Sequence, residues 1–213
     1  MSSLDEMSCS PLALTLSQMT LSFVPLRFDG VVRRPLCADG KNRVFHVGSV
    51  SKWIAPGFRF GWVVAPKDHR ADLAKQKEWA NLQTSTLLQA IFTSWAIPEN
   101  CDGVLIRARE FYRTHAERLV ALLRHYLPDW HVVVPEGGLT LWVETNLRGS
   151  EIAFLRHALI HGVVVDAGSR FFPFRPETEQ IMLRLGFSSL SFDQLEDAVK
   201  RLKKAAKSFK QRT

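Results

Sequence analysis

The sequence of 213 residues is poor in cysteine, has no long apolar run and lacks early basic residues, and each shortage argues against a class of protein. Its three cysteines, Cys9, Cys37 and Cys101, form no Cys-x-x-Cys pair or Cys/His cluster, so neither a disulfide framework nor a zinc site is expected. No window approaches the roughly 20 apolar residues that a membrane span needs. The segment before Arg27 contains no lysine or arginine, unlike the start of a signal peptide. We therefore expect a cytoplasmic protein with no membrane partner.

Basic residues exceed acidic ones, 28 against 21, which gives a net charge of +7. Such a charge attracts phosphate polymers, so nucleic acid has to be considered as a partner. Much of the excess lies between Lys200 and Arg212, where it alternates at helical spacing with the apolar Val199, Leu202 and Phe209. This pattern is typical of the solvated face of a helix, and no known nucleic-acid-binding motif occurs. Nucleic acid is therefore an unlikely partner for this chain.

The periodicity of apolar residues predicts a mixed α/β chain. Residues 1–22 show no clear period, and their structure is undetermined. The patterns predict strands over 43–48, 60–65, 131–134, 139–144, 162–166 and 181–187, and helices over 67–79, 81–97, 104–126, 150–161 and 191–209. The strand over 60–65 is expected to be buried, and Pro98 is expected to end the second helix. Ser150 and Ser191 are predicted N-caps, with Gln194 completing a capping box.

One lysine, Lys52, lies within an otherwise apolar and glycine-rich segment, Gly-Ser-Val-Ser-Lys-Trp-Ile-Ala-Pro-Gly-Phe-Arg-Phe-Gly-Trp, at residues 48–62. Apolar surroundings and the second cation, Arg59, both favour the neutral, nucleophilic amine that reacts with a carbonyl. Ser49 and Ser51 offer hydroxyl donors, and the planar fork of Arg59 suits a phosphate. The segment therefore suits a phosphorylated aldehyde, although its composition alone is also that of a surface loop.

The spacing Ser-x-Ser-Lys-x-x-x-Pro-Gly-x-Arg-x-Gly-Trp is very similar to the cofactor-lysine segment of fold-type I pyridoxal-phosphate enzymes, the class I/II aminotransferases. Within that group the chain most resembles 2-aminoadipate-type aminotransferases and the aminotransferase-like domain of MocR regulators, which belong to the GntR superfamily. The likeness covers residues 26–209, the second half of a full-length enzyme. It implies the C-terminal part of the large cofactor-binding domain at 23–103, a connecting helix at 104–127 and a small α+β domain at 128–213.

The resemblance implies pyridoxal phosphate as cofactor and assigns a role to each residue of the segment. Lys52 would anchor the cofactor covalently and move the proton between the substrate and the cofactor. Ser49, Ser51 and Arg59 would hold the cofactor phosphate. The substrates would be an amino acid and a 2-oxo acid, and the protein would form a homodimer.

Two further residues are assigned to the substrate by the same resemblance. Arg184, in Ile-Met-Leu-Arg-Leu-Gly-Phe-Ser, matches the arginine that binds the substrate carboxylate, and its fork of donors suits that role. A buried structural salt bridge is the alternative for a cation in an apolar strand. Gly138 resembles part of a turn that faces the substrate, but a glycine turn between paired strands explains it equally well.

The chain departs from the family where an aspartate and a tyrosine normally contact the cofactor ring. The matching positions fall near Thr20, Leu21 and Ser22, so the carboxylate that keeps the ring nitrogen protonated is absent there. We therefore expect a truncated aminotransferase of low activity. The alternative is a non-catalytic effector-binding or dimerisation module derived from a MocR-type regulator.

Overall fold

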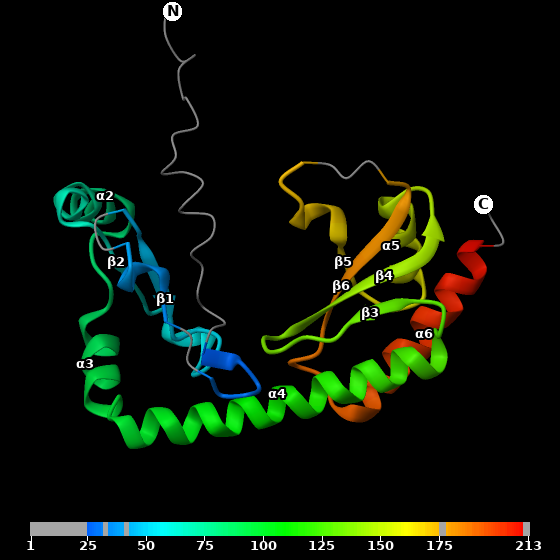
Figure 1. Ribbon diagram of the computed structural model, residues 1–213, viewed down its shortest axis with the longest axis horizontal. Helices are drawn as coiled ribbons and strands as arrows, with labels where there is room; N and C mark the ends of the chain where they lie inside the picture. The colour runs from blue at the N-terminus through cyan, green and yellow to red at the C-terminus, as the bar shows by residue number, and fades with distance from the viewer. Residues whose placement is uncertain (1–24, 32–33, 41–42, 175–177, 211–213) are drawn as a thin grey trace, which may run out of the picture. The chain divides into compact units, whose positions relative to one another are not determined.

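The computed structural model describes residues 25–31, 34–40, 43–174 and 178–210 of a mixed α/β chain (Figure 1). The chain divides into two units, Met1–Ala108, called unit 1, and Arg109–Thr213, called unit 2. The division falls within the longest helix, α4, which runs over Pro98–Tyr126. The α/β class predicted from the apolar periodicity is confirmed.

Unit 1 is built on a two-stranded antiparallel hairpin. Strand β1, His46–Ser49, pairs with β2, Gly61–Val64, so that Gly48 lies opposite Trp62. Helices α2, Arg70–Asn81, and α3, Thr86–Trp95, follow the hairpin in sequence. Short 3-10 turns occur at Leu36–Ala38, Pro56–Phe58 and Lys67–His69. The two predicted strands of this region are thus present, and they deliver the lysine segment as their connection.

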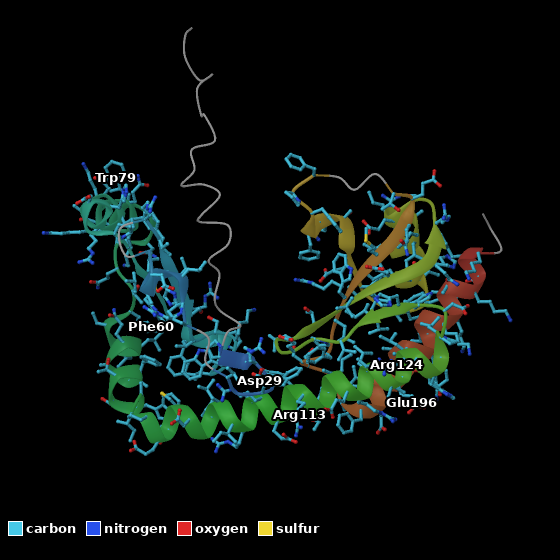
Figure 2. The ribbon with its side chains drawn as sticks, in the orientation of Figure 1. Asp29, Phe60, Trp79, Arg113, Arg124 and Glu196 are labelled. Carbon is cyan, nitrogen blue, oxygen red and sulfur yellow. The ribbon has the colours of Figure 1, made fainter. Side chains whose placement is uncertain are left out.

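The prediction that the second strand is buried is wrong. Trp62, Val63 and Val64 keep 39%, 52% and 50% of their surface exposed. Neither α2 nor α3 contains a buried residue, and Trp79 of α2 extends into solvent (Figure 2). The apolar residues of β2 therefore favour a strand, but they do not by themselves bury it. Burial requires other helices or strands to pack over β2, and the described part of unit 1 supplies none.

Unit 2 contains a four-stranded antiparallel sheet in the order β3-β4-β6-β5, together with helices (Figure 1). Its strands are β3, His131–Val133, β4, Thr140–Arg148, β5, Asp166–Ala167, and β6, Gln180–Gly186. Its helices are α5, Glu151–Ile160, α6, Phe192–Lys210, and the part of α4 from Arg109 onward. The strand predicted at 162–166 forms only at its end, because residues 163–165 make no ladder with β6. A 3-10 turn, η5, Gly168–Phe171, follows β5 directly.

Alternating buried residues of β4 and a nearly continuous buried run of β6 contribute to the core of unit 2. Every second side chain of β4, beginning at Leu141, is buried, as expected for a strand with one face against helices. The rings of Phe154 on α5 and Phe209 on α6 meet edge to face at 5.3 Å between centroids. The apolar stripe of α6 is buried and its lysines are exposed, so α6 is the amphipathic helix that the spacing up to Lys210 predicts.

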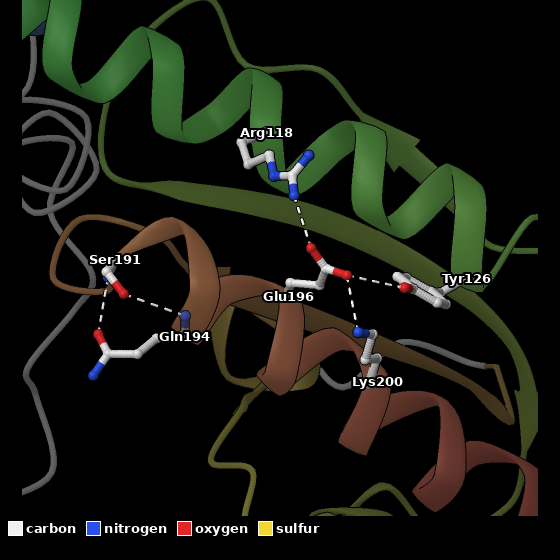
Figure 3. A network of polar contacts seen from close by, with 6 residues as sticks. All are labelled: Arg118, Tyr126, Ser191, Gln194, Glu196 and Lys200. Atoms are coloured by element: carbon white, nitrogen blue, oxygen red, sulfur yellow. Dashed lines mark hydrogen bonds and ion pairs between the residues drawn. The ribbon is translucent and has the colours of Figure 1, made fainter.

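The predicted N-caps of α5 and α6 are confirmed. Ser150 Oγ accepts a hydrogen bond from the Ala153 amide at 3.2 Å. At α6, Ser191 Oγ accepts from the Gln194 amide at 3.3 Å, and Gln194 Oε1 accepts from the Ser191 amide at 2.9 Å (Figure 3). Helix α3 ends at Trp95, before Pro98 as predicted. Pro98 then begins α4, since a first-turn residue has no helical partner for its missing N–H.

A carboxylate on α6 ties that helix to α4. Glu196 bonds to Arg118 at 2.8 Å, to the Tyr126 hydroxyl at 3.1 Å and to Lys200 at 2.9 Å (Figure 3). The hydrogen bond from Lys200, then that from Tyr126, lowers the pKa of the Glu196 carboxyl. The ionised carboxylate therefore stabilises the contact between these two helices.

Candidate functional site

The lysine segment forms a closed loop between β1 and β2. The buried Val50 donates its amide to the Phe60 carbonyl at 3.2 Å and accepts from the Ile54 amide at 2.9 Å. These bonds extend the hairpin by one pair and start a tight turn over residues 50–54. The bond between Val50 and Phe60 therefore holds the two ends of the loop side by side at the end of the hairpin.

The two serines predicted to bind phosphate are brought together. Their Oγ atoms lie 3.0 Å apart, and the Ser51 amide donates to Ser49 Oγ at 3.1 Å. Ser49 Oγ also bonds to the Phe60 carbonyl at 3.3 Å. Both side chains are half-buried, so this end of the loop presents a paired set of hydroxyls.

Arg59 lies at the opposite end of the loop, directly after the 3-10 turn Pro56–Phe58. Its backbone is left-handed, with φ 48° and ψ 34°, a conformation that costs a non-glycine residue about 1–2 kcal/mol. Its exposed side chain lines a cavity of about 840 Å³, together with Ser49. Sequence reasoning predicted both residues for the phosphate, and the structure puts them on one cavity.

Helix α2 forms the other side of this cavity and adds two cations that no sequence motif selects. Arg70 and Lys77 both line it. Arg70 Nε also donates to the Ala65 carbonyl at 3.0 Å, which holds the start of α2 against the end of β2. Charged residues of an amphipathic helix look alike in sequence, and only the fold distinguishes those that face the hairpin.

A glycine is required at position 48, which lines the cavity. A Cβ built on Gly48 would lie 2.3–2.7 Å from three atoms of the Trp62 ring, which covers it from the opposite strand. The backbone of β1 and the indole therefore approach more closely than any side chain would allow.

Lys52 occupies the turn three residues beyond Ser49. Its side chain is exposed, and it is not among the residues that line the cavity. Lys52 is therefore open to solvent, whereas the sequence led us to expect apolar surroundings. Among the apolar residues of the segment, Val50 is fully buried.

Arg184 belongs to unit 2, where a row of residues crosses three strands. Trp142 on β4, Arg184 on β6 and Asp166 on β5 are direct partners in register and share one face of the sheet. Arg184 donates to Asp166 Oδ2 from Nε at 3.1 Å and from Nη2 at 2.7 Å. The guanidinium also stacks over Phe171 of η5, 4.2 Å from the ring centre. The side chains of Arg184 and Asp166 are 38% and 43% exposed, so the salt bridge is open to solvent rather than buried.

Gly138 lies in the connection between β3 and β4, which pair as predicted. Its φ of 89° is accessible to glycine and unfavourable for other residues. The turn geometry by itself accounts for glycine at this position, and a role toward the substrate stays a prediction.

The sequence profile of aminotransferase class I and II matches residues 18–202. The chain belongs to this family. It is 29% identical over 186 residues to aromatic-amino-acid aminotransferase 1 of Thermococcus litoralis, covering 85% of this chain and 44% of that protein. It is 24% identical to the uncharacterized HTH-type transcriptional regulator YdfD of Bacillus subtilis, covering 82% of this chain and 36% of that protein.

Solved structures of aminotransferases share the fold of this family member. The α-aminoadipate aminotransferase LysN of Thermus thermophilus, complexed with N-(5'-phosphopyridoxyl)-L-leucine, superposes with a TM-score of 0.79 at 25% identity. The match covers 95% of this chain and 54% of LysN. The chain thus spans about half the length of the relatives it matches, and the resemblance to fold-type I enzymes, including 2-aminoadipate-type ones, is confirmed.

The family and its structures imply pyridoxal phosphate as the cofactor, and the donors around the unit 1 cavity suit its phosphate group. The cavity combines the cations Arg59, Arg70 and Lys77 with the Ser49 hydroxyl and the Trp62 ring. Its volume lies within the range of small-molecule sites. The departures predicted near Thr20, Leu21 and Ser22 lie outside the described residues.

The described residues contain no group of three or more His, Cys, Asp or Glu side chains placed to hold a metal ion. Among the same residues, no helix is both long and apolar enough to cross a membrane.

Proposed function

We propose that this chain carries cofactor-binding and substrate-binding parts of a pyridoxal-phosphate-dependent aminotransferase, which transfers an amino group from an amino acid to a 2-oxo acid. The observation that carries the proposal is the lysine segment. Its serines and arginine lie at the two ends of a closed loop, and Ser49 and Arg59 line one cationic cavity. The family match over residues 18–202 gives this geometry its chemical meaning.

Lys52 holds the cofactor through its Nζ atom and serves as the base that takes the proton from the substrate α-carbon. Pyridoxal phosphate, when bound, supplies an electron-withdrawing ring that stabilises the negative charge left on that carbon. A lysine can hold and return a proton only while its amine is neutral. The exposure of Lys52 in the described residues means that bound cofactor and substrate have to provide the desolvation that this requires.

Ser49, Ser51 and Arg59 bind the cofactor phosphate. A guanidinium and two hydroxyls supply directed donors, and a charge-assisted bond to phosphate is stronger than a neutral one. Arg70 and Lys77 add positive charge around the same cavity. The left-handed backbone of Arg59 fixes where its side chain leaves the loop, so the strain is used to aim the guanidinium.

Arg184 binds the substrate carboxylate in unit 2, and Gly138 lies in a turn beside the substrate. A carboxylate matches the two parallel N–H groups at the end of a guanidinium.

Turnover by this chain is low, because Thr20, Leu21 and Ser22 offer no carboxylate to keep the cofactor nitrogen protonated. The family resemblance further supports a homodimer, which light scattering over a range of protein concentrations would test; a monomer at every concentration would contradict it.

The test of cofactor anchoring is reductive trapping. Pyridoxal phosphate is added to the chain, the linkage is reduced with borohydride, and the modified lysine is located by peptide mapping. We expect absorbance near the visible edge and modification at Lys52, both lost in Lys52→Ala. Lys75→Ala, which removes an exposed lysine of α2 outside the cavity lining, should keep both. Modification spread evenly over surface lysines would contradict the assignment.

A non-catalytic effector-binding module is the second candidate, and the similarity to the regulator YdfD over 82% of the chain favours it. The two candidates differ in product formation. An aminotransferase incubated with an amino acid, a 2-oxo acid and the cofactor forms a new amino acid, detected by mass spectrometry. Binding of the amino acid without any product, in a chain that is modified at Lys52, would favour the regulator-type module.

A further inference from the structure

The guanidinium of Arg184 is only partly engaged by its neighbours in unit 2. Asp166 accepts from Nε and Nη2 with a single oxygen, Oδ2, and so occupies the side edge of the guanidinium. Phe171 covers one face. Within the described part of the chain, no residue bonds to Nη1. The end of the guanidinium, formed by Nη1 and the second N–H of Nη2, is therefore the edge open to a ligand carboxylate.

Aromatic rings lie beside the Arg184 guanidinium. Trp142 on β4 is the register partner of Arg184. Its ring meets the rings of Phe171 and Phe172 edge to face, with centroid distances of 6.4 and 5.8 Å. Phe171 and Phe172 remain 48% and 39% exposed, so they present apolar surface beside the cation. A ligand that places a ring there gains contact area and favourable ring geometry in addition to its ion pair.

The charge of Asp166 sets a limit on what can accompany that carboxylate. The ion pair with Arg184 is close to neutral as a unit, so the first carboxylate of a ligand binds mainly through directed hydrogen bonds. A second carboxylate nearby would meet the negative charge of Asp166 with no further cation from the row. Because both members of the pair are about 40% exposed, solvent reduces this repulsion but does not remove it.

We propose that Asp166 is a specificity-determining residue, which makes the Arg184 site select monocarboxylates with an aromatic side chain over dicarboxylates. The inference rests on the proposed role of Arg184 in carboxylate binding. Asp166 acts on the ligand in two ways: it holds the guanidinium with its end edge outward, and it disfavours additional negative charge.

The experiment compares 3-phenylpropionate with glutarate by ligand-observed NMR titration against the full chain. The ratio of the two dissociation constants is the readout, since looser positioning of Arg184 weakens both ligands alike and cancels in the ratio. Wild type should bind 3-phenylpropionate more tightly. Asp166→Asn should shift the ratio toward glutarate by about threefold, a value typical of partly exposed charge pairs. The shift should shrink at high ionic strength, where the charge is screened.

Two variants make the result specific. Asp129→Asn removes the same charge from a loop where Asp129 bonds to Asn146, and it should leave the ratio unchanged. Phe171→Ala should weaken binding of 3-phenylpropionate more than binding of glutarate.

If both ligands bind but Asp166→Asn leaves the ratio of their dissociation constants at the wild-type value, the specificity inference is overturned while carboxylate binding stands. If Arg184→Ala binds both ligands as wild type does, or wild type binds neither, the carboxylate role and the inference fall together.

Discussion

At the scale of single residues, the backbone of Gly168 packs so closely against β6 that no residue with a side chain would fit there. A Cβ there would lie 2.6 Å from Met182 Cβ, 2.7 Å from the Met182 carbonyl oxygen and 2.8 Å from the carbonyl carbon. Two of these are backbone atoms of a paired strand, so relief requires moving β6 or the turn η5. We expect Gly168→Ala to lower the free energy of unfolding of unit 2 by about 1–3 kcal/mol, measured by urea denaturation.

Gly186→Ala is the matched control for this substitution. Gly186 ends β6, and a Cβ built on it meets nothing within 4 Å. The added methyl group should change stability little. An equal loss in the two variants would show that close packing on Met182 is not what requires glycine at position 168.

Glu196 makes the stability of unit 2 depend on pH. Its carboxyl pKa is lowered in the folded chain, first by the hydrogen bond from Lys200 and then by that from Tyr126. A group with a lowered folded pKa binds fewer protons folded than unfolded, so its contribution is present above the unfolded value of about 4.3 and is lost as pH falls through the folded pKa. Glu196→Gln should therefore reduce the difference between the urea midpoints at neutral and acid pH.

Glu117→Gln supplies the comparison, since the exposed Glu117 of α4 makes no hydrogen bond to a described residue. It should preserve the wild-type pH dependence. The same dependence in Glu196→Gln and wild type would remove Glu196 as its source.

At the scale of elements, the capping box sets where α6 begins. Ser191 and Gln194 exchange two bonds and satisfy two amides that the first turn leaves without helical partners. Ser191→Ala should cost about 1 kcal/mol of unfolding free energy. A double-mutant cycle with Gln194→Ala, followed by circular dichroism in urea, should reveal coupling between the two positions; strictly additive losses would contradict a reciprocal box.

Elements fixed by neighbouring residues could be predicted from the sequence, and those fixed by distant contacts could not. The caps at Ser150 and Ser191 depend on bonds over three residues, and their patterns predict them correctly. The exposure of β2 and the short length of β5 depend on which elements cover or pair with them. The partner of Arg184 likewise follows from the register of β5 on β6, which brings Asp166 opposite it from 18 positions away in sequence.

The candidate site divides in the same way. The motif spacing selects Ser49, Ser51 and Arg59, and the hairpin brings the hydroxyls together and puts Ser49 and Arg59 on one cavity. Arg70 and Lys77 could not be selected, because their approach to the cavity depends on how α2 lies on the hairpin. The exposure of Lys52 also escaped prediction, since an apolar segment does not reveal whether its side chains gather around the lysine or beneath it.

At the scale of the whole molecule, the two units differ in how much they bury. The described helices α2 and α3 of unit 1 contain no buried residue, and every residue of β2 is exposed. Unit 2 encloses large side chains completely, including Phe154, Phe187 and Leu183. Local opening costs least where few apolar contacts break, so the units should open with different free energies.

Native-state hydrogen exchange followed by mass spectrometry measures this difference directly. Amides of α2 and α3 should exchange much faster than those of β4 and β6, whose ladder bonds lie over the core of unit 2. Adding pyridoxal phosphate should slow exchange in the hairpin β1–β2 and in α2, which line the cavity, and Lys52→Ala should weaken that effect. Equal protection in both units would mean that unit 1 is stabilised by contacts other than apolar burial, since its described elements enclose so little surface.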